Sequence, residues 1–255
     1  MTRTMKTFAR RVGRRRQVLA PALLLLVLAL GSFAFLAIAD EVAEGEIRAF
    51  DERLLLSMRN PADPADPIGP PWLEEMALEV TAVGGYPLIV LSLAVVAGLL
   101  VVTRRFGAAL YAVLSVGSGA LVSHFLKHFY DRPRPDIVAH LDVIHTASFP
   151  SGHAMVTTVA YLTLAALVMR FFEDWRVRAY VLCVAVLVAL LVGISRVYLG
   201  VHWPSDVAAG WALGAAWASL TWLVVTLLAL YRNSGGGAGA GNQLREGAPE
   251  AMENP

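Results

Sequence analysis

Six long stretches of this sequence contain no Asp, Glu, Lys or Arg, and this feature constrains the fold more than any other. The stretches cover residues 18–39, 87–102, 106–126, 154–169, 179–195 and 207–231. All 21 basic and 20 acidic residues fall outside them, although 57% of the chain is hydrophobic. A helix that crosses a bilayer needs ~17–25 mostly apolar residues. The pattern therefore predicts an all-α, polytopic membrane protein with six transmembrane helices in a bundle.

The distribution of basic residues predicts how the chain is oriented. Seven basic residues precede the first apolar stretch, and they are Arg3, Lys6, Arg10, Arg11, Arg14, Arg15 and Arg16. Cytoplasmic flanks of membrane spans collect Lys and Arg, and after six crossings 14 of the 21 basic residues share the N-terminal side. Both termini are thus expected to be cytoplasmic, in a bacterial cytoplasmic membrane. A basic run can also bind nucleic acid, but beside an apolar stretch we read it as an orientation signal and expect no nucleic-acid partner.

Three regions follow from composition. Residues 1–17 form a basic cytoplasmic N-terminus, residues 18–232 the membrane domain, and residues 233–255 a flexible cytoplasmic tail that begins with a glycine-rich run. The outer segment 40–86 holds eleven of the 20 acidic residues. Within it we expect an amphipathic helix over Glu46–Arg59 and a short helix over Trp72–Val83, separated by five prolines.

A short motif at the end of the first apolar stretch leaves its cleavage open, and the cysteine content limits disulfide and zinc chemistry. Residues 37–39 (Ala-Ile-Ala) resemble a signal-peptidase site, so cleavage of the first apolar stretch stays open, although that stretch exceeds the ~7–15 residues usual for a signal peptide. Cys183 is the only cysteine, so no intramolecular disulfide or cysteine-based zinc site can form.

Three polar clusters fall on the outer side in this topology. They are Lys127–Pro135, Pro150–His153 and Ser195–Asp206. Lys127, Arg134 and Arg196 suit an oxyanion, because guanidinium and ammonium groups form strong charge-assisted hydrogen bonds with phosphate. Ser151 and Gly152 precede an apolar helix, whose N-terminal amides form a ready anion site.

The same clusters also contain groups for covalent phosphoryl transfer. His202 and Asp206 are four residues apart, about one helical turn. The carboxylate can hold one ring nitrogen of His202 and leave the other free to attack. His153 is then available as a separate proton donor.

These clusters resemble the three signatures of the type 2 phosphatidic acid phosphatase superfamily. The signatures are K-x6-R-P at Lys127–Pro135, P-S-G-H at Pro150–His153 and S-R-x5-H-x3-D at Ser195–Asp206. The resemblance implies a phosphohistidine mechanism without metal or other cofactor, at a site shared with the vanadium haloperoxidases, and therefore inhibition by vanadate.

The resemblance also implies a role for each signature residue. His202 would be the nucleophile, His153 the general acid and base, and Asp206 the residue that orients His202. The residues expected to hold the phosphate are Lys127, Arg134, Ser151, Gly152 and Arg196.

Other polar residues near the clusters are expected to be structural. His124, His128, His140 and His145 match no signature. Arg132, Asp131 and Asp136 are interpreted as a solvated or loop-fixing set, with a secondary phosphate contact by Arg132 left open. Tyr198 is expected to pack in the core, and a position lining the site is left open.

The expected partner is a phosphorylated lipid that enters sideways from the bilayer. Candidates are undecaprenyl diphosphate, phosphatidic acid and phosphatidylglycerol phosphate, and the bacterial topology favours undecaprenyl diphosphate or a broad-specificity phosphatase. A lipid phosphotransferase would share the first half-reaction. A transporter is a remote alternative, because transporters place ionisable groups near the bilayer midplane and these spans contain no Asp, Glu, Lys or Arg. The sequence does not determine the oligomeric state.

Overall fold

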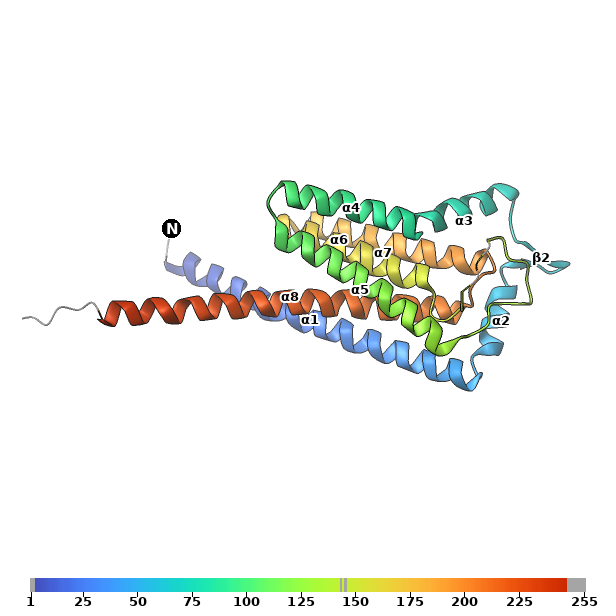
Figure 1. Cartoon of the computed structure of the whole chain (residues 1–255), viewed down its shortest axis with the longest axis horizontal. Coiled ribbons are helices and arrows are strands. Elements are labelled where there is room, and N and C mark those ends of the chain that lie inside the picture. The colour runs from blue at the N-terminus through green and yellow to red at the C-terminus, as the bar shows by residue number, and fades with distance from the viewer. Residues whose placement is uncertain (1–2, 143, 145, 247–255) are drawn as a thin grey trace, which may run out of the picture.

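A computed structural model describes residues 3–142, 144 and 146–246, and it is dominated by helices. In chain order the elements are α1 (Arg3–Glu44), α2 (Arg48–Leu56), β1 (Arg59–Asn60), β2 (Asp63–Pro67), α3 (Pro71–Val83), α4 (Tyr86–Val102), α5 (Phe106–Tyr130), α6 (Gly152–Phe171), α7 (Trp175–Tyr198) and α8 (Pro204–Glu246). The long helices run roughly side by side as a bundle, and α2 and the strands lie at one end of it (Figure 1).

The helices long and apolar enough to cross a membrane agree with the predicted six spans. Five single spans lie within α1, α5, α6, α7 and α8. The pair α3 and α4 meets the same criteria together, with a bend of 44° between its members. Counted as one bent span, the pair gives six, and the bend falls where the chain passes through Gly84 and Gly85. Large apolar side chains such as Phe33 and Val102 are 72% and 81% exposed, as expected where lipid is the solvent.

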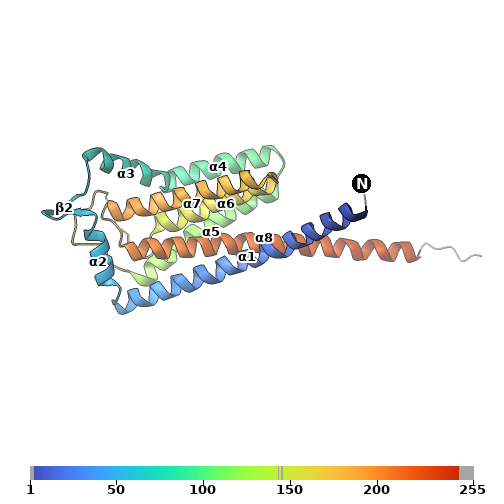
Figure 2. The same ribbon diagram turned by 180° about the vertical axis from the view of Figure 1, so that it is seen from behind.

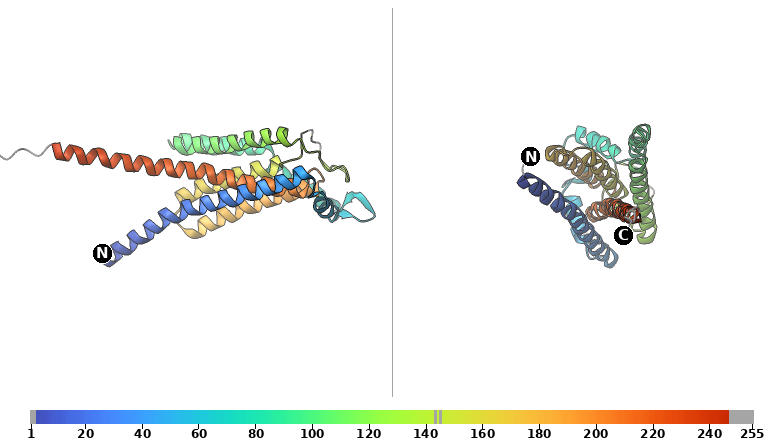
Figure 3. Two further views of the ribbon diagram at one scale, coloured as in Figure 1. Left: turned by 90° about the horizontal axis from the view of Figure 1, so that it is seen from below. Right: turned by 90° about the vertical axis from the view of Figure 1, so that its left-hand side faces the viewer.

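Helix α8 packs against both α1 and α6, and small residues on α8 allow the contact with α6 to be close. A Cβ at Gly210 would lie 2.8 Å from the Ser151 carbonyl oxygen, and one at Gly214 would lie 2.8 Å from the Met155 carbonyl oxygen. Small residues four apart let membrane helices approach in this way. The views from behind and along the bundle show α1 crossing α8 (Figures 2 and 3). The close contact brings the start of α8 to the start of α6, where two of the polar clusters lie.

The outer segment differs in part from the sequence-based expectation. A helix forms, but α2 ends at Leu56, and the chain then makes a two-stranded antiparallel hairpin of β1 and β2 that the sequence did not predict. Strand β2 contains Pro64 and Pro67. Proline has no backbone N–H to donate to a neighbouring strand, so it is tolerated in an edge strand such as β2. Helix α3 has almost the expected bounds.

The C-terminal helix extends beyond its apolar span. Helix α8 continues to Glu246, past the end of its apolar span at Tyr231, so the expected flexible tail begins as helix. The rest of that tail, residues 247–255, lies outside the described residues, as do residues 1–2 of the basic N-terminus.

Candidate active site

The three polar clusters come together at one end of the bundle, where α5 ends, α6 begins and α7 turns into α8. Lys127 and Arg196 lie in the last turns of α5 and α7, Ser151 is the N-cap of α6, and Asp206 lies in the first turn of α8. His202 lies in the short connection between α7 and α8. The residues singled out from sequence therefore meet at one place.

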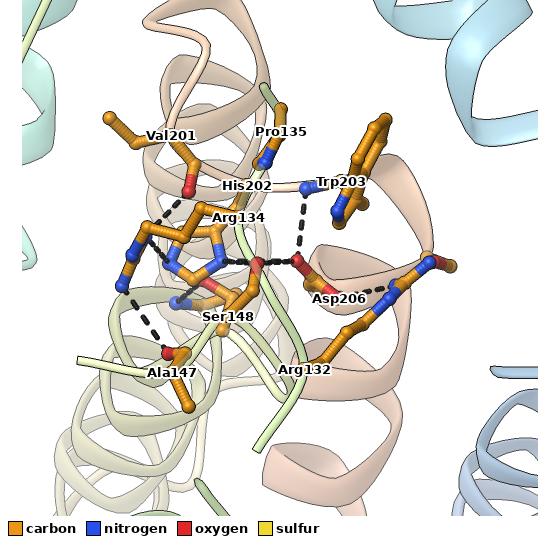
Figure 4. A network of polar contacts seen from close by, with 12 residues as sticks. Arg132, Arg134, Pro135, Ala147, Ser148, Val201, His202, Trp203 and Asp206 are labelled. Atoms are coloured by element: carbon orange, nitrogen blue, oxygen red, sulfur yellow. Dashed lines mark hydrogen bonds and ion pairs between the residues drawn. The ribbon is translucent and has the colours of Figure 1, made fainter. Parts of the chain in front are cut away.

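His202 faces Asp206 through one ring nitrogen. Nδ1 lies 3.3 Å from Asp206 Oδ2, and the two residues are 1% and 0% exposed. The same carboxylate oxygen accepts hydrogen bonds from the Trp203 amide at 2.9 Å and from the Ser148 hydroxyl. The Trp203 amide, the Ser148 hydroxyl and the Arg132 guanidinium hold this carboxylate in place, and His202 lies against it (Figure 4). A proton on Nδ1 directed at Asp206 leaves a lone pair on Nε2.

The other ring nitrogen of His202 faces Arg134. Arg134 Nη1 lies 3.3 Å from Nε2 and donates to the Val201 carbonyl oxygen at 2.5 Å. Burial, then the positive charges of Arg134 and Lys127, lower the pKa of His202 well below its usual 6.5. The imidazole is therefore neutral at physiological pH. Burial lowers the pKa of Arg134 to about 10, so this guanidinium remains a cation under the same conditions.

Arg196 carries hydrogen-bond donors that protein groups do not use. Its side chain is fully buried, and Nη1 donates to Thr81 Oγ1 and Asp142 Oδ2, both at 2.8 Å. Nε and Nη2 have no partner among the described residues. Buried donors without a partner are costly, so Arg196 is suited to hold an anion in the site.

The start of α6 lies close to the third cation. A Cβ added at Gly152 would lie 3.3 Å from Lys127 Cε, so glycine leaves room for the lysine side chain. Lys127 Nζ donates to the Ala147 carbonyl oxygen at 2.5 Å. The Ser151 amide donates to the Asp206 carbonyl oxygen at 3.0 Å, which fixes α6 to α8. His153 follows in the first turn of α6, half-buried.

Arg132, which was expected to be solvated or loop-fixing, is mostly buried and lies against the Asp206 carboxylate. Its Nη1 lies 2.6 Å from Asp206 Oδ1, and its Nη2 lies 2.8 Å from Asp51 Oδ2. Asp51 is fully buried on α2 and also accepts hydrogen bonds from the Ser205 amide and hydroxyl, at 2.8 and 2.5 Å. Arg132 thus links α2 to Asp206.

Sequence reasoning missed several of these partners. Asp51 had one usable signal: it is four residues before Leu55 on an amphipathic helix, and both side chains are fully buried. Ser148, Thr81 and Asp142 carried no spacing or motif that marked them.

The remaining residues considered from sequence have local partners. The Nδ1 of His128 lies 2.8 Å from the His124 carbonyl oxygen, and His140 Nε2 lies 2.5 Å from the Pro135 carbonyl oxygen. The Tyr198 hydroxyl donates to the Ile68 carbonyl oxygen at 2.9 Å, in the core. His145 lies outside the described residues. Within residues 3–142, 144 and 146–246, no three His, Cys, Asp or Glu side chains are grouped as metal ligands.

A neutral histidine held by a buried carboxylate, with cations around it at one end of the bundle, is suited to phosphoryl transfer. Comparisons with known proteins agree. Residues 108–229 match the model of the PAP2 superfamily. The chain is 30% identical over 185 residues to phosphatidylglycerophosphatase B of Bacillus subtilis strain 168, which covers 71% of this chain and 85% of the relative. It is 39% identical over 109 residues to decaprenylphosphoryl-5-phosphoribose phosphatase of Mycobacterium tuberculosis strain H37Rv, covering 40% and 55%.

A solved structure supports the same assignment. The crystal structure of a transmembrane PAP2 type phosphatidylglycerolphosphate phosphatase from Bacillus subtilis matches with a TM-score of 0.66 and 28% identity, over 79% of this chain and 93% of that one. The chain belongs to the PAP2 superfamily, and it is a multi-pass membrane lipid phosphatase of that type, as the three signatures predicted.

Proposed function

We propose that this phosphatase cleaves the terminal phosphate of a lipid through a phosphohistidine at His202. The observation that carries the proposal is the position of the His202 ring, with Nδ1 towards Asp206 and Nε2 towards Arg134. A ring kept neutral by burial and by nearby cations has a lone pair ready for attack. The cations that keep the ring neutral are also those suited to bind the phosphate.

In the first half-reaction, Nε2 of His202 attacks phosphorus and the bond from phosphorus to the lipid oxygen breaks. His153 donates a proton to the departing oxygen, which leaves as an alcohol or, from a diphosphate, as a phosphate. Asp206 stabilises the positive charge that develops on the His202 ring. Lys127, Arg134 and Arg196, with the amides around Ser151 and Gly152 at the start of α6, hold the phosphoryl oxygens.

In the second half-reaction, His153 accepts a proton from water as the water oxygen attacks phosphorus. The bond from phosphorus to Nε2 breaks, which releases inorganic phosphate and restores neutral His202. The chemistry described here needs no metal, and this independence is itself a proposal that a chelator tests. Transfer to a second lipid hydroxyl in place of water would make the protein a phosphotransferase.

Arg132 and Asp51 act as positioning residues in this scheme. Arg132 divides its guanidinium between Asp206 and Asp51, so Asp51 fixes the direction from which Arg132 contacts the catalytic carboxylate. Outer partners of this kind orient the groups that touch the substrate.

For the substrate, we propose a glycerophospholipid phosphomonoester such as phosphatidylglycerol phosphate. The support is the relative named phosphatidylglycerophosphatase B, which aligns with 71% of this chain. Undecaprenyl diphosphate, which the bacterial topology favoured, is the second candidate. The decisive comparison is kcat/KM for phosphatidylglycerol phosphate, phosphatidic acid and undecaprenyl diphosphate in the same detergent.

We also propose that both termini are cytoplasmic and that the site opens on the outer face, because most basic residues lie on the N-terminal side. After replacement of Cys183 by serine, single cysteines at Asp66 and Arg176 report on the two faces. A membrane-impermeant maleimide should label the first variant in intact cells and the second only after lysis. The reverse pattern would invert the topology.

The mechanism is tested by rapid quenching with a lipid labelled in its terminal phosphate. The wild-type protein should trap acid-labile label on the chain, and His202→Ala should trap none and release no phosphate. Full activity in His202→Ala would refute the nucleophile assignment, and label appearing on an acceptor lipid would favour the phosphotransferase.

A further inference from the structure

A groove of about 670 Å³ lies at the end of the bundle opposite the catalytic site. It is formed where the turn between α4 and α5, the end of α6 and the side of α8 come together. Helix α5 begins at this groove and reaches the catalytic site at Lys127, 21 residues later, which at 1.5 Å per residue is a separation of about 30 Å. The groove is therefore remote from the phosphate site, close to the other membrane surface.

The inner wall of the groove is apolar and its rim is cationic. Phe106, Leu110, Val225 and Leu228 contribute the apolar surface. Phe106, Leu110 and Leu228 are 58–60% exposed, so this wall is open to whatever surrounds the bundle.

The rim carries Arg104, Arg105 and Arg170. Arg105 stacks over Phe171, with its guanidinium carbon 3.9 Å from the ring centroid, which fixes this cation above the apolar wall. Arg104 has a left-handed backbone, with φ of 57°, in the tight turn between α4 and α5. No acidic residue contributes to the lining.

We propose that this groove binds an anionic phospholipid of the adjacent leaflet, with an acyl chain against the apolar wall and the phosphate among the three arginines. The lining carries the complementary chemistry, because an apolar groove that is also lined by three arginines can take up both the tail and the anionic headgroup of one lipid. Arginines are common at cytoplasmic helix ends because of the positive-inside bias. That bias explains their presence on this face but not their placement around one groove.

Two other cations on the same face provide a matched control. Arg176 and Arg178 lie in the first turn of α7 and do not line the groove. A general surface attraction for anionic lipid would depend on them as much as on the rim arginines.

The experiment is native mass spectrometry of the full chain released from detergent, with phosphatidylglycerol or phosphatidylcholine of identical acyl chains. The wild-type protein should retain phosphatidylglycerol in preference to phosphatidylcholine. The double variant Arg104→Gln/Arg170→Gln leaves Arg105 on Phe171 and should weaken phosphatidylglycerol binding about 25-fold, at about fivefold per arginine. The control Arg176→Gln/Arg178→Gln should bind as the wild type does.

Three results would overturn the proposal. One is equal binding of the two lipids by the wild type, which would indicate a non-selective apolar surface. Another is equal loss in the rim and control variants, which would indicate surface charge alone. The last is phosphatidylglycerol binding that survives in the rim variant and is displaced by vanadate, which would place the lipid at the catalytic site. Phosphate release from a lipid substrate by the rim variant shows that it is folded, and the binding result does not depend on the proposed mechanism.

Discussion

Replacing Asp51 by asparagine tests whether helix α2 contributes to catalysis through the carboxylate that holds His202. The substitution keeps the side-chain volume and removes one negative charge from a fully buried position. It weakens the contact between residue 51 and Arg132, which is 2.8 Å in the wild type, and it weakens the side chain as a hydrogen-bond acceptor for the Ser205 amide. Arg132 is then balanced by Asp206 alone, which leaves less of the Asp206 charge available to stabilise His202 as it attacks.

The magnitude follows from the contacts that are lost. A hydrogen bond to a charged group contributes about 1.5–3 kcal/mol, and about 1.4 kcal/mol corresponds to tenfold in rate. We therefore expect kcat to fall by about tenfold to a hundredfold. KM should stay within about twofold, because Asp51 has no direct contact with the residues of the proposed phosphate site. Its replacement therefore removes no interaction that binds the substrate and the transition state equally.

The assay is steady-state phosphate release from phosphatidylglycerol phosphate in detergent, with the melting temperature of each variant measured alongside. Glu52→Gln is the matched control, since Glu52 is the neighbouring residue on α2 and, among the described residues, its ion pair is with Arg48 at the surface. Loss of one partner of a buried ion pair can cost about 3–5 kcal/mol of stability, so Ser205→Ala serves as a milder second variant. Wild-type kcat in a folded Asp51→Asn protein, or a change confined to KM, would refute the reasoning.

Three further outcomes are expected. Because nearby cations contribute to the lowered pKa of His202, the NMR titration of its ring should move to higher pH in Arg134→Gln, and a shift to lower pH would contradict the proposed site. Gly193→Ala should lower the free energy of unfolding by about 1–3 kcal/mol, and the melting temperature with it, because the new Cβ would lie 2.4 Å from the Trp211 ring. Gly98→Ala should leave the melting temperature unchanged, because the new Cβ would meet nothing within 4 Å. Vanadate should inhibit phosphate release competitively and EDTA should leave the rate unchanged, so complete loss with EDTA would disprove metal independence.

The membrane architecture was predictable because the bilayer imposes a strict length and polarity requirement on each span. The charge-free stretches mark five single spans and α4, whereas α3, which carries three glutamates, was expected as a separate short helix and joins α4 in the bent pair. The convergence of the three clusters was also predictable, since sidedness and an even number of crossings place span ends on a common face. His202 and Asp206 meet as expected from their proximity in sequence, although His202 precedes α8 and only Asp206 lies in its first turn.

What sequence could not provide was the set of contacts made by irregular segments. The loop between α5 and α6 supplies Ser148 and Asp142, and their positions depend on how that loop folds across the bundle rather than on any periodicity. The hairpin of β1 and β2 was missed for a related reason: it lies in a proline-rich run, where local propensity argues against strands. Asp51 belongs to a different part of the chain from the proposed catalytic residues, 155 positions before Asp206.

The buried link from Asp51 through Arg132 to Asp206 has a consequence for how such sequences diverge. Loss of Arg132 would leave Asp51 as a buried carboxylate without its cation, whereas Arg132 would keep Asp206 as a partner if Asp51 were lost. Homologues that lack the arginine at the position of Arg132 should therefore also lack the acidic residue at the position of Asp51, or place a new cation opposite it. Two positions that no signature specifies, one of them within K-x6-R-P, would then change together, and this paired change would identify the homologues whose outer helix is docked onto the Asp206 carboxylate.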